Sequence, residues 1–390
     1  MNAVEIHAGF VPLVDAAPLI VAADMGFAAE EGIDLRLSRE ASWSNIRDKV
    51  AVGVYPAAHM LAPRALAMSL GAGAMSAEVI APFVLNTGGD VIGVSASLAA
   101  ELWPDGAPFG DAMAVGRALL RAAETRSRMS IATPFPHSMH LELLRYWLEG
   151  CGGDPARDAS IQTVPPPLMA EALAAGQLDV FCVGEPWGSL AVSRGAGVLV
   201  LPTAAIWGWA PEKVLGVRRD WAEARPETLA ALLRALHRTG SWLARPQNAA
   251  VAAEVLGRPD RLDLPAELIE RGLTGTLVVA PNGASRRIPR FIGFDAPEAT
   301  FPWRSQAHWI ASRAALRWGV EPADARAAAE ACFRPDLYRA AVAQTGADLP
   351  GASSKVEGAL KGRVGIASAR GEMSLGPDVF FDGRVFDPAQ

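Results

Sequence analysis

Two histidines three residues apart, His137 and His140, raise the first chemical question in this sequence. A His-x-x-His pair can ligate a metal ion, but no neighbouring carboxylate or cysteine clearly completes a ligand set here. A predicted helix starts at Ser138 after the loop 133–137, so His140 should lie in its first turn. There the ring could donate a hydrogen bond into a cleft, with a structural cap as the alternative, and no metal is predicted.

The rest of the sequence lacks the motifs of common catalytic chemistries. The cysteines, Cys151, Cys182 and Cys332, are far apart and form no CxxC pair, so neither a zinc site nor a disulfide framework is indicated. There is no Gly-x-Ser-x-Gly and no Walker sequence, and Gly71-Ala-Gly73 lacks the third glycine of a dinucleotide loop. We therefore expect neither an enzyme nor a cofactor.

Three predicted helix starts each follow a predicted strand, at Ser42-Trp43, Ser138-Met-His140 and Gly184-Glu-Pro-Trp187. A helix N-terminus presents unpaired N–H groups and about half a positive charge, which together favour a small anion. The alternative for each is an ordinary helix cap. Trp43 differs because it directly follows a cap, where its indole N–H could point at a ligand.

The elements that must position these residues alternate between strand and helix. Strands are predicted at 4–10, 33–37 and 57–61, with helices at 16–29 and 43–52. A second unit begins near Leu98, with strands at 129–132, 161–164 and 178–183. After Leu201 the chain returns to the first unit through a strand at 214–217 and a helix at 226–243. This order predicts an α/β protein of two doubly wound, largely parallel lobes, with a ligand in the cleft between them.

Composition excludes some partners. The 390 residues are 51% hydrophobic and carry a formal net charge of −6, which argues against binding nucleic acid or anionic lipid directly by charge. The most apolar zone, 61–94, is interrupted by charges and prolines, so no membrane-spanning helix is predicted. The chain starts on a strand without a basic leader region, which predicts that the protein stays in the compartment where it is made.

Seven short motifs occur in order along nearly the whole chain. They are Ala41-Ser-Trp43-x-x-x-Arg47-Asp-Lys49, Ala57-Ala-His59-Met-Leu-Ala-Pro63, Arg145-Tyr-Trp147, Val164-Pro-Pro-Pro167, Phe181-Cys-Val-Gly-Glu-Pro-Trp187, Pro211-Glu-Lys213 and Phe380-Phe381-Asp-Gly. Together they resemble the nitrate/bicarbonate-binding proteins of ABC importers (NrtA/CmpA type). The resemblance implies a periplasmic-binding-protein type II fold that closes on a solute by hinge motion. We expect lobe 1 at 1–97 plus 202–283, lobe 2 at 98–201, and a C-terminal helical extension at 284–390 packed on the lobes.

The resemblance also implies a ligand site. Trp43 matches the cleft tryptophan, His140 the histidine at the start of the second-lobe helix, and Gly184 the glycine whose backbone N–H contacts the anion. Lys213 matches the lysine that neutralises the anion. In the bicarbonate branch the histidine and the lysine are replaced by residues suited to a metal-assisted site. Their retention here favours nitrate or nitrite and argues against calcium.

One position departs from the family pattern. The family has an amide side chain in the loop that reads Leu85-Asn-Thr-Gly-Gly-Asp90 here, and Asp90 falls on the amide position. A carboxylate facing a monoanion would cost Coulomb energy unless it pairs with Lys213 or is protonated. Otherwise Asp90 turns away and Asn86 or Thr87 substitutes, or the ligand differs from nitrate.

The branch of the family without an export signal resembles the cytoplasmic nitrate/nitrite sensors of the NasS type. Such a sensor holds an RNA-binding antiterminator of the NasT type inactive and releases it when the anion binds. We therefore expect a non-enzymatic cytoplasmic sensor that works by cleft closure. The alternatives are the solute-binding subunit of an ABC importer, exported to the periplasm and docking on a permease, and an enzyme on the same fold, such as those of thiamine-pyrimidine or menaquinone synthesis.

Overall fold

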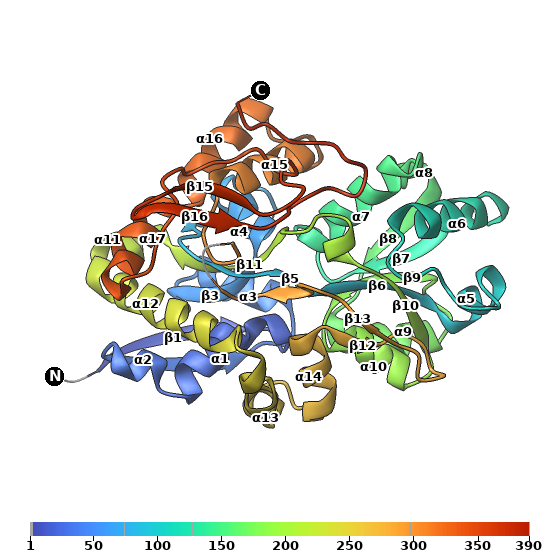
Figure 1. Cartoon of the computed structure of the whole chain (residues 1–390), viewed down its shortest axis with the longest axis horizontal. Helices are drawn as coiled ribbons and strands as arrows, with labels where there is room; N and C mark the ends of the chain where they lie inside the picture. Colours follow the sequence, from blue (N-terminus) through green and yellow to red (C-terminus); the bar gives the residue numbers. More distant parts are fainter. Residues whose placement is uncertain (1–2, 74, 127, 296–297, 390) are drawn as a thin grey trace.

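The computed structural model describes residues 3–73, 75–126, 128–295 and 298–389, which form two α/β lobes side by side with a C-terminal extension across them (Figure 1). Each lobe contains one mixed sheet covered by helices. The largest apolar core is continuous from the first lobe, at Val11 and Ile46, into the second, at Ile92 and Phe181. None of the helices in the described residues is long and apolar enough to cross a membrane.

In the described residues, the sheet of the first lobe has the strand order β14–β5–β11–β3–β1–β2, with β4 pairing β11. Its strands are β1 (Val4–Phe10), β2 (Ile33–Arg39), β3 (Ala57–Leu61), β4 (Val79–Ile80), β5 (Val84–Gly88), β11 (Pro211–Arg218) and β14 (Ile292–Gly293). The helices of this lobe are η1 (Val14–Ala16), α1 (Ala17–Asp24), α2 (Phe27–Glu30), α3 (Trp43–Ala51), α4 (Ala62–Ser69), α11 (Arg219–Ala224), α12 (Pro226–Leu243), η4 (Pro246–Asn248), α13 (Ala249–Gly257) and α14 (Ala266–Thr274).

The sheet of the second lobe has the order β10–β6–β9–β7–β8. Its strands are β6 (Asp90–Ser95), β7 (Met129–Thr133), β8 (Ala159–Thr163), β9 (Val180–Gly184) and β10 (Gly197–Pro202). Its helices are α5 (Ala96–Leu102), α6 (Ala112–Thr125), α7 (Met139–Gly150), α8 (Pro155–Asp158), η2 (Pro166–Leu168), α9 (Met169–Ala174), α10 (Trp187–Ser193) and η3 (Thr203–Ala205). A hairpin of β12 (Thr276–Val278) and β13 (Ser285–Arg287) stands apart from both sheets.

The chain passes from one sheet to the other at a pair of glycines. β5 ends in the first sheet at Gly88, and β6 begins in the second at Asp90. Gly88 and Gly89 have φ values of +63° and +93°, a region that favours glycine. A Cβ on Gly88 would also lie 2.5 Å from the carbonyl oxygen of Phe291. The crossing therefore needs glycine for both conformation and space.

The strands depart from the predicted lobe boundaries at two points. β6 was expected within the first lobe but pairs in the second sheet, and β14 was expected in the extension but pairs with β5 of the first. β6 belongs to the second sheet because Gly88 and Gly89 redirect the chain eight residues before the predicted boundary at 97. The division into lobes as folding units stays a prediction.

Two expectations about individual elements need correction. The helix predicted at 16–29 is interrupted at Gly26, whose φ of +87° ends α1 and lets α2 start in a new direction. The sheets are parallel only in part, at β3–β1–β2 and β9–β7–β8. The strands beside the crossings, β5, β6, β10 and β11, pair antiparallel, because they carry the chain back and forth between lobes.

The predicted helix at 226–243 is confirmed as α12.

The C-terminal extension contacts both lobes. It contains α15 (Arg304–Ala314), η5 (Ala315–Trp318), α16 (Pro322–Cys332), α17 (Pro335–Val342), η6 (Ala343–Thr345), β15 (Val364–Ser368) and β16 (Gly371–Leu375). α15 packs on α4 of the first lobe and α7 of the second. Arg313 pairs with Glu149, and Arg317 with the buried Glu142, so two ion pairs hold α7 against the extension.

Replacing Gly88 by alanine should destabilise the protein more than replacing Gly195, which has a similar φ of +69° but open space around its Cβ position. Both variants force an L-residue into the left-handed region, at about 1–2 kcal/mol. Gly88→Ala adds overpacking against Phe291, by roughly a further 1–3 kcal/mol. Urea unfolding measures both losses, and equal losses would show that the crossing tolerates a side chain.

Candidate functional site

The ends of several strands from both sheets meet at the junction of the lobes and place a group of charged side chains there. β11 contributes Glu212 and Lys213, and the segment after β1 contributes Asp15. From the second lobe come Asp90, the first residue of β6, and His140 on α7. These five residues, hereafter the junction cluster, are each at most 2% exposed. Such charges are found in a protein interior only when they are paired.

Local structure explains how α7 presents His140. Ser138 caps the helix, and its hydroxyl accepts a hydrogen bond from the backbone N–H of Leu141 at 3.2 Å. The first turn therefore starts at Met139, one residue after the predicted start at Ser138, and His140 points into the junction rather than to solvent. Ser42 caps α3 in the same way for Trp43, accepting from the N–H of Asn45 at 3.3 Å.

Lys213 lies at the centre of the cluster. Its Nζ is 2.6 Å from Asp15 Oδ2, 3.0 Å from Glu212 Oε1 and 3.9 Å from Asp90 Oδ1. Burial by itself would lower the pKa of the ammonium, but Asp15 and Glu212 raise it well above its usual range. Lys213 is therefore charged at every physiological pH.

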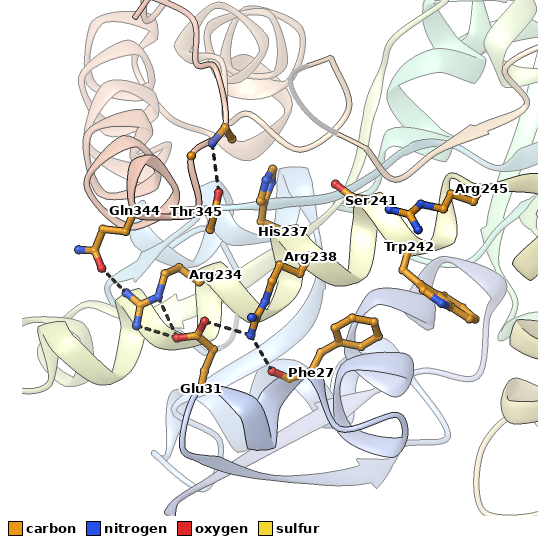
Figure 2. Close-up of a pocket in the computed structure, with 12 residues that line it drawn as sticks. Phe27, Glu31, Arg234, His237, Arg238, Ser241, Trp242, Arg245, Gln344 and Thr345 are labelled. Carbon is orange, nitrogen blue, oxygen red and sulfur yellow. Dashed lines mark hydrogen bonds and ion pairs between the residues drawn. The ribbon is translucent and has the colours of Figure 1, made fainter. Parts of the chain in front are cut away.

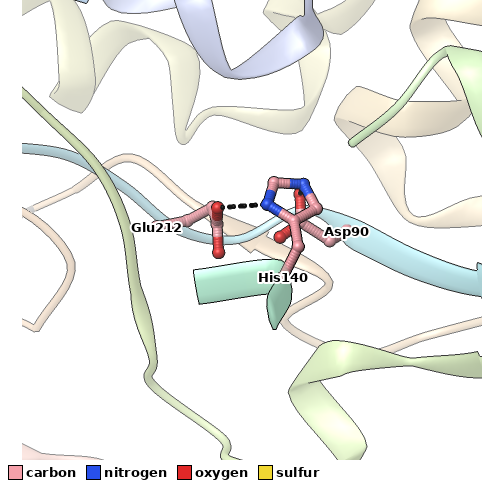
Figure 3. Close-up of side chains that lie close together, drawn as sticks. All are labelled: Asp90, His140 and Glu212. Atoms are coloured by element: carbon pink, nitrogen blue, oxygen red, sulfur yellow. Dashed lines mark ion pairs between the residues drawn. The ribbon is translucent and has the colours of Figure 1, made fainter. Parts of the chain in front are cut away.

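His140 bridges two carboxylates from different sheets (Figure 3). Its Nε2 lies 3.1 Å from Asp90 Oδ1 and its Nδ1 lies 3.1 Å from Glu212 Oε1. Burial opposes the charge, but Asp90 and Glu212 outweigh it and raise the pKa of His140 to about 9. A ring with this pKa carries a positive charge at neutral pH and forms an ion pair with each carboxylate.

The three carboxylates differ in their proton affinity. Burial would raise the pKa of Asp15 and that of Glu212, but Lys213 and a histidine beside each keep both pKa values below their usual range. Asp90 is farther from Lys213, and burial together with the charge on Glu212 raises its pKa to about 7. Asp90 is therefore the member of the cluster that gains a proton most easily.

His59, on β3, is a further neighbour of Asp15. Its Nε2 is 3.0 Å from Asp15 Oδ1, and its Nδ1 accepts the N–H of Val11 at 3.4 Å. Burial lowers the pKa of His59, so the ring is neutral at pH 7. Because His59 adds no charge, the ionisable groups of the junction cluster are its three carboxyl groups and its two cations, His140 and Lys213.

All five residues predicted from the sequence, Trp43, Asp90, His140, Gly184 and Lys213, come together here. The Trp43 ring lies 5.7 Å from Lys213 Nζ, and its Nε1 is buried without a hydrogen-bond partner among the described residues. Gly184 pairs with Asp90 across β9 and β6. A Cβ on Gly184 would lie 3.1 Å from Asp90 Oδ1 and 2.8 Å from Leu13, so a close approach requires the glycine.

Asp90 faces the cluster and does not turn away. Of the two substitutes considered for it, Asn86 donates through Nδ2 to the carbonyl of Gly88 at 2.8 Å, which supports the chain crossing instead. Thr87 is a buried residue of β5 whose side chain approaches Gly293 in the first sheet. The Asp90 carboxylate is thus one of the groups that a ligand at the junction would meet.

Sequence reasoning missed Asp15, His59 and Glu212. His59 and Glu212 lie inside motifs singled out above, and Glu212 is next to Lys213, so both carried a usable signal. Asp15 carried none, because an acidic residue at the start of a helix is normally an ordinary N-terminal charge.

The cluster does not fit a metal ion. Asp90, His140 and Glu212 do lie close enough together for one cation, with ligand atoms within 4.8 Å of one another. A metal-bound histidine must be neutral with a free lone pair, whereas both nitrogens of His140 face carboxylates. Lys213 Nζ is also 3.0 Å from Glu212 and 3.9 Å from Asp90, so a metal ion between these carboxylates would lie close to the charged ammonium.

Contacts between the lobes surround the cluster. The N–H of Val14 donates to the carbonyl of Glu185 at 2.8 Å, and the Trp187 indole donates to the carbonyl of Pro12 at 2.8 Å. Elsewhere between the lobes, Arg64 Nη1 lies 2.7 Å from His137 Nδ1. Direct contacts therefore join the two lobes around the cluster, which explains its burial.

A separate open pocket of about 730 Å³ lies between α2 and α12 of the first lobe and η6 of the extension (Figure 2). No residue of the junction cluster lines it. Its arginines are Arg234, Arg238 and Arg245, and the first two pair with Glu31 at 2.8 and 3.0 Å. The residues that the sequence predicts for an anion site lie at the junction and not in this pocket.

Both lobes, the chain crossings and a buried polar junction define a two-lobed solute-binding protein of the periplasmic-binding-protein fold. In comparisons, residues 1–257 match the model of the NMT1-like family. The chain is 30% identical to the nitrate/nitrite binding protein NrtA of Synechococcus elongatus, over 97% of this chain and 83% of that protein. It therefore belongs to the NMT1-like family and is a homologue of the NrtA nitrate-binding proteins.

Solved structures agree with this assignment. The periplasmic nitrate-binding protein NrtA from Synechocystis PCC 6803 matches with a TM-score of 0.84 and 27% identity, over 100% of this chain and 96% of that one. The alkanesulfonate-binding protein SsuA from Xanthomonas axonopodis shares the fold, with a TM-score of 0.59 and 15% identity over 83% and 98% of the two chains. The chain is also 31% identical to the nitrate import ATP-binding protein NrtC of Synechocystis, of which it spans 54%.

The stability of the protein should fall as pH rises from 7 to 9. The pKa of His140 is about 9 in the folded protein and 6.5 ordinarily, so its stabilisation is complete below pH 6.5 and lost as pH rises through 9. We expect a loss of about 2 kcal/mol between pH 7 and 9 by urea unfolding. His140→Gln, which does not titrate, should show a flatter profile, and an identical slope in both proteins would contradict the assignment.

Proposed function

We propose that this chain binds nitrate or nitrite at the junction of its lobes. The observation that carries the proposal is Trp43, a residue 4% exposed whose indole N–H lacks a partner among the described residues and whose ring centroid lies 5.7 Å from Lys213 Nζ. A buried donor without an acceptor is costly, and an anion oxygen would satisfy it. The homology to NrtA, which is named for binding nitrate and nitrite, supports the same ligand.

The ligand would be held from both lobes. Trp43 and Lys213 belong to the first lobe, and His140 and the backbone N–H of Gly184 to the second. An anion contacting all four would bind the closed form more tightly than the open one and shift the population towards closure. The relatives are named as binding and transport components, which favours a binding protein over an enzyme.

Trp43→Phe should weaken nitrate binding by roughly ten- to a hundredfold in calorimetric titration, because a hydrogen bond to a charged acceptor contributes about 1.5–3 kcal/mol. Trp207→Phe is the matched control: its Nε1 is also buried without a partner among the described residues, but its ring packs on Phe380. It should leave the affinity unchanged. Equal affinity of Trp43→Phe and the unaltered protein would remove Trp43 from the site.

We further propose that the bound anion is a signal, and that the chain is a cytoplasmic sensor controlling an RNA-binding antiterminator of the NasT type. The motif resemblance described above supports this role. The net charge of −6 also favours a partner that provides the RNA-binding surface itself. In this scheme the open form holds the partner, and closure on the anion releases it.

A second candidate is the solute-binding subunit of an ABC importer. It is favoured by the relatives, which include the nitrate import ATP-binding protein NrtC and the bicarbonate transport ATP-binding protein CmpC of Synechocystis. The same cleft would then deliver the anion to a permease. The two roles differ in compartment and in partner.

Affinity purification of the tagged chain from its native cells, with and without 1 mM nitrate added, separates these roles. The sensor role predicts an RNA-binding partner in the cytoplasmic fraction that is lost on adding nitrate. Recovery from the periplasm, with permease components in the membrane fraction, would contradict the sensor and support the importer. Trp43→Phe, purified in parallel, should keep its partner at nitrate concentrations that release it from the unaltered chain.

A further inference from the structure

Asp90 occupies an unfavourable place for a fixed negative charge beside a bound anion. It is fully buried at the crossing between the lobes and lies opposite Gly184. Its Oδ1 is 3.1 Å from His140 Nε2 and 3.9 Å from Lys213 Nζ, so it shares the two cations proposed to hold the ligand. An anion that contacts those cations therefore competes with Asp90 for them.

Charged groups from every neighbouring element bear on Asp90. α7 contributes His140, β11 contributes Glu212 and Lys213, and the segment after β1 contributes Asp15. The turn after β9 contributes Glu185, which is buried and whose pKa burial raises to about 7. The thiol of Cys182 on β9 is neutral, because burial raises its pKa well above the usual value.

The balance of these charges is already negative before a ligand enters. Above pH 7, where Asp90 is ionised, the three carboxylates of the junction cluster exceed its two cations by one charge. A monoanion would raise the excess to two in a site sealed from water, where like charges interact strongly. Adding a proton with the anion leaves the excess at one.

We propose that Asp90 takes up one proton when the anion binds, so that the site accepts an oxoanion and a proton together. The inference rests on the proposed function. The Asp90 carboxyl becomes an O–H donor that the anion oxygen accepts, and His140 and Lys213 are freed to face the ligand. Burial and Glu212 raise the pKa of Asp90 to about 7, so this carboxyl loses its proton only near neutral pH.

Calorimetric titration with sodium nitrate at pH 6, 7 and 8, in phosphate and in Tris, measures the protons exchanged, because the two buffers have different ionisation enthalpies. At pH 8 we expect uptake of about one proton per anion and, above pH 7, an affinity that falls about tenfold per pH unit. At pH 6, where Asp90 is already protonated, the uptake should approach zero. Because this measurement uses the unaltered protein, its result does not depend on whether a variant folds.

Asp90→Asn supplies a neutral donor of the same shape. It should bind nitrate with no proton uptake, with an affinity independent of pH between 6 and 8, and about tenfold more tightly than the unaltered protein at pH 8. Asp179→Asn is the matched control, since this carboxylate accepts the N–H of Ser130 outside the cluster. It should keep the proton uptake of the unaltered protein.

Nitrate binding by the unaltered protein at pH 8 without proton uptake would overturn the inference and leave the proposed function standing. Proton uptake that persists in Asp90→Asn would assign the proton to another buried acid, such as Glu185, and overturn the role of Asp90. If neither nitrate nor nitrite binds to any variant at any of these pH values, the proposed function fails and the inference with it.

Discussion

The structure depends on keeping a group of charges paired in a place without water. Removing an ion from water costs several kcal/mol, and only close opposite charges and hydrogen bonds offset that cost. In the junction cluster, Lys213 and Glu212 come from the first lobe, and Asp90 and His140 from the second. Lys213 pairs with Asp15 and Glu212 within the first lobe, whereas His140 pairs with Glu212, and Lys213 with Asp90, only where the two lobes meet.

The backbone around the cluster serves the same constraint. Gly184 has room only for a hydrogen between Leu13 and Asp90, and Gly88 lets the chain cross beside Phe291. The C-terminal extension contacts α7, the helix that carries His140. Ion pairs join Arg317 to Glu142 and Arg313 to Glu149. Two ion pairs therefore fix the helix that carries His140 to the extension.

Much of the fold follows from local patterns. The helix at 226–243 has proline at its first position and an amphipathic period, and it forms with the predicted bounds. Ser42 and Ser138 cap their helices as expected, since capping depends on residues within one turn. The interruption at Gly26 and the placement of β6 were missed. Both depend on positive φ values at glycines, which a periodic pattern does not reveal.

The sequence by itself determined the identities of the elements and, through short motifs, five residues that meet at the junction: Trp43, Asp90, His140, Gly184 and Lys213. Only the tertiary structure decided the electrostatic character of that junction. Asp15 reaches Lys213 across nearly two hundred residues, and Glu212 meets Asp90 through the ring of His140. Proton affinity depends on burial and on neighbours within a few ångströms. Those neighbours are distant along the chain. The motifs indicated positive groups for an anion, whereas the folded site also holds three carboxylates, one of which has a pKa raised to about 7.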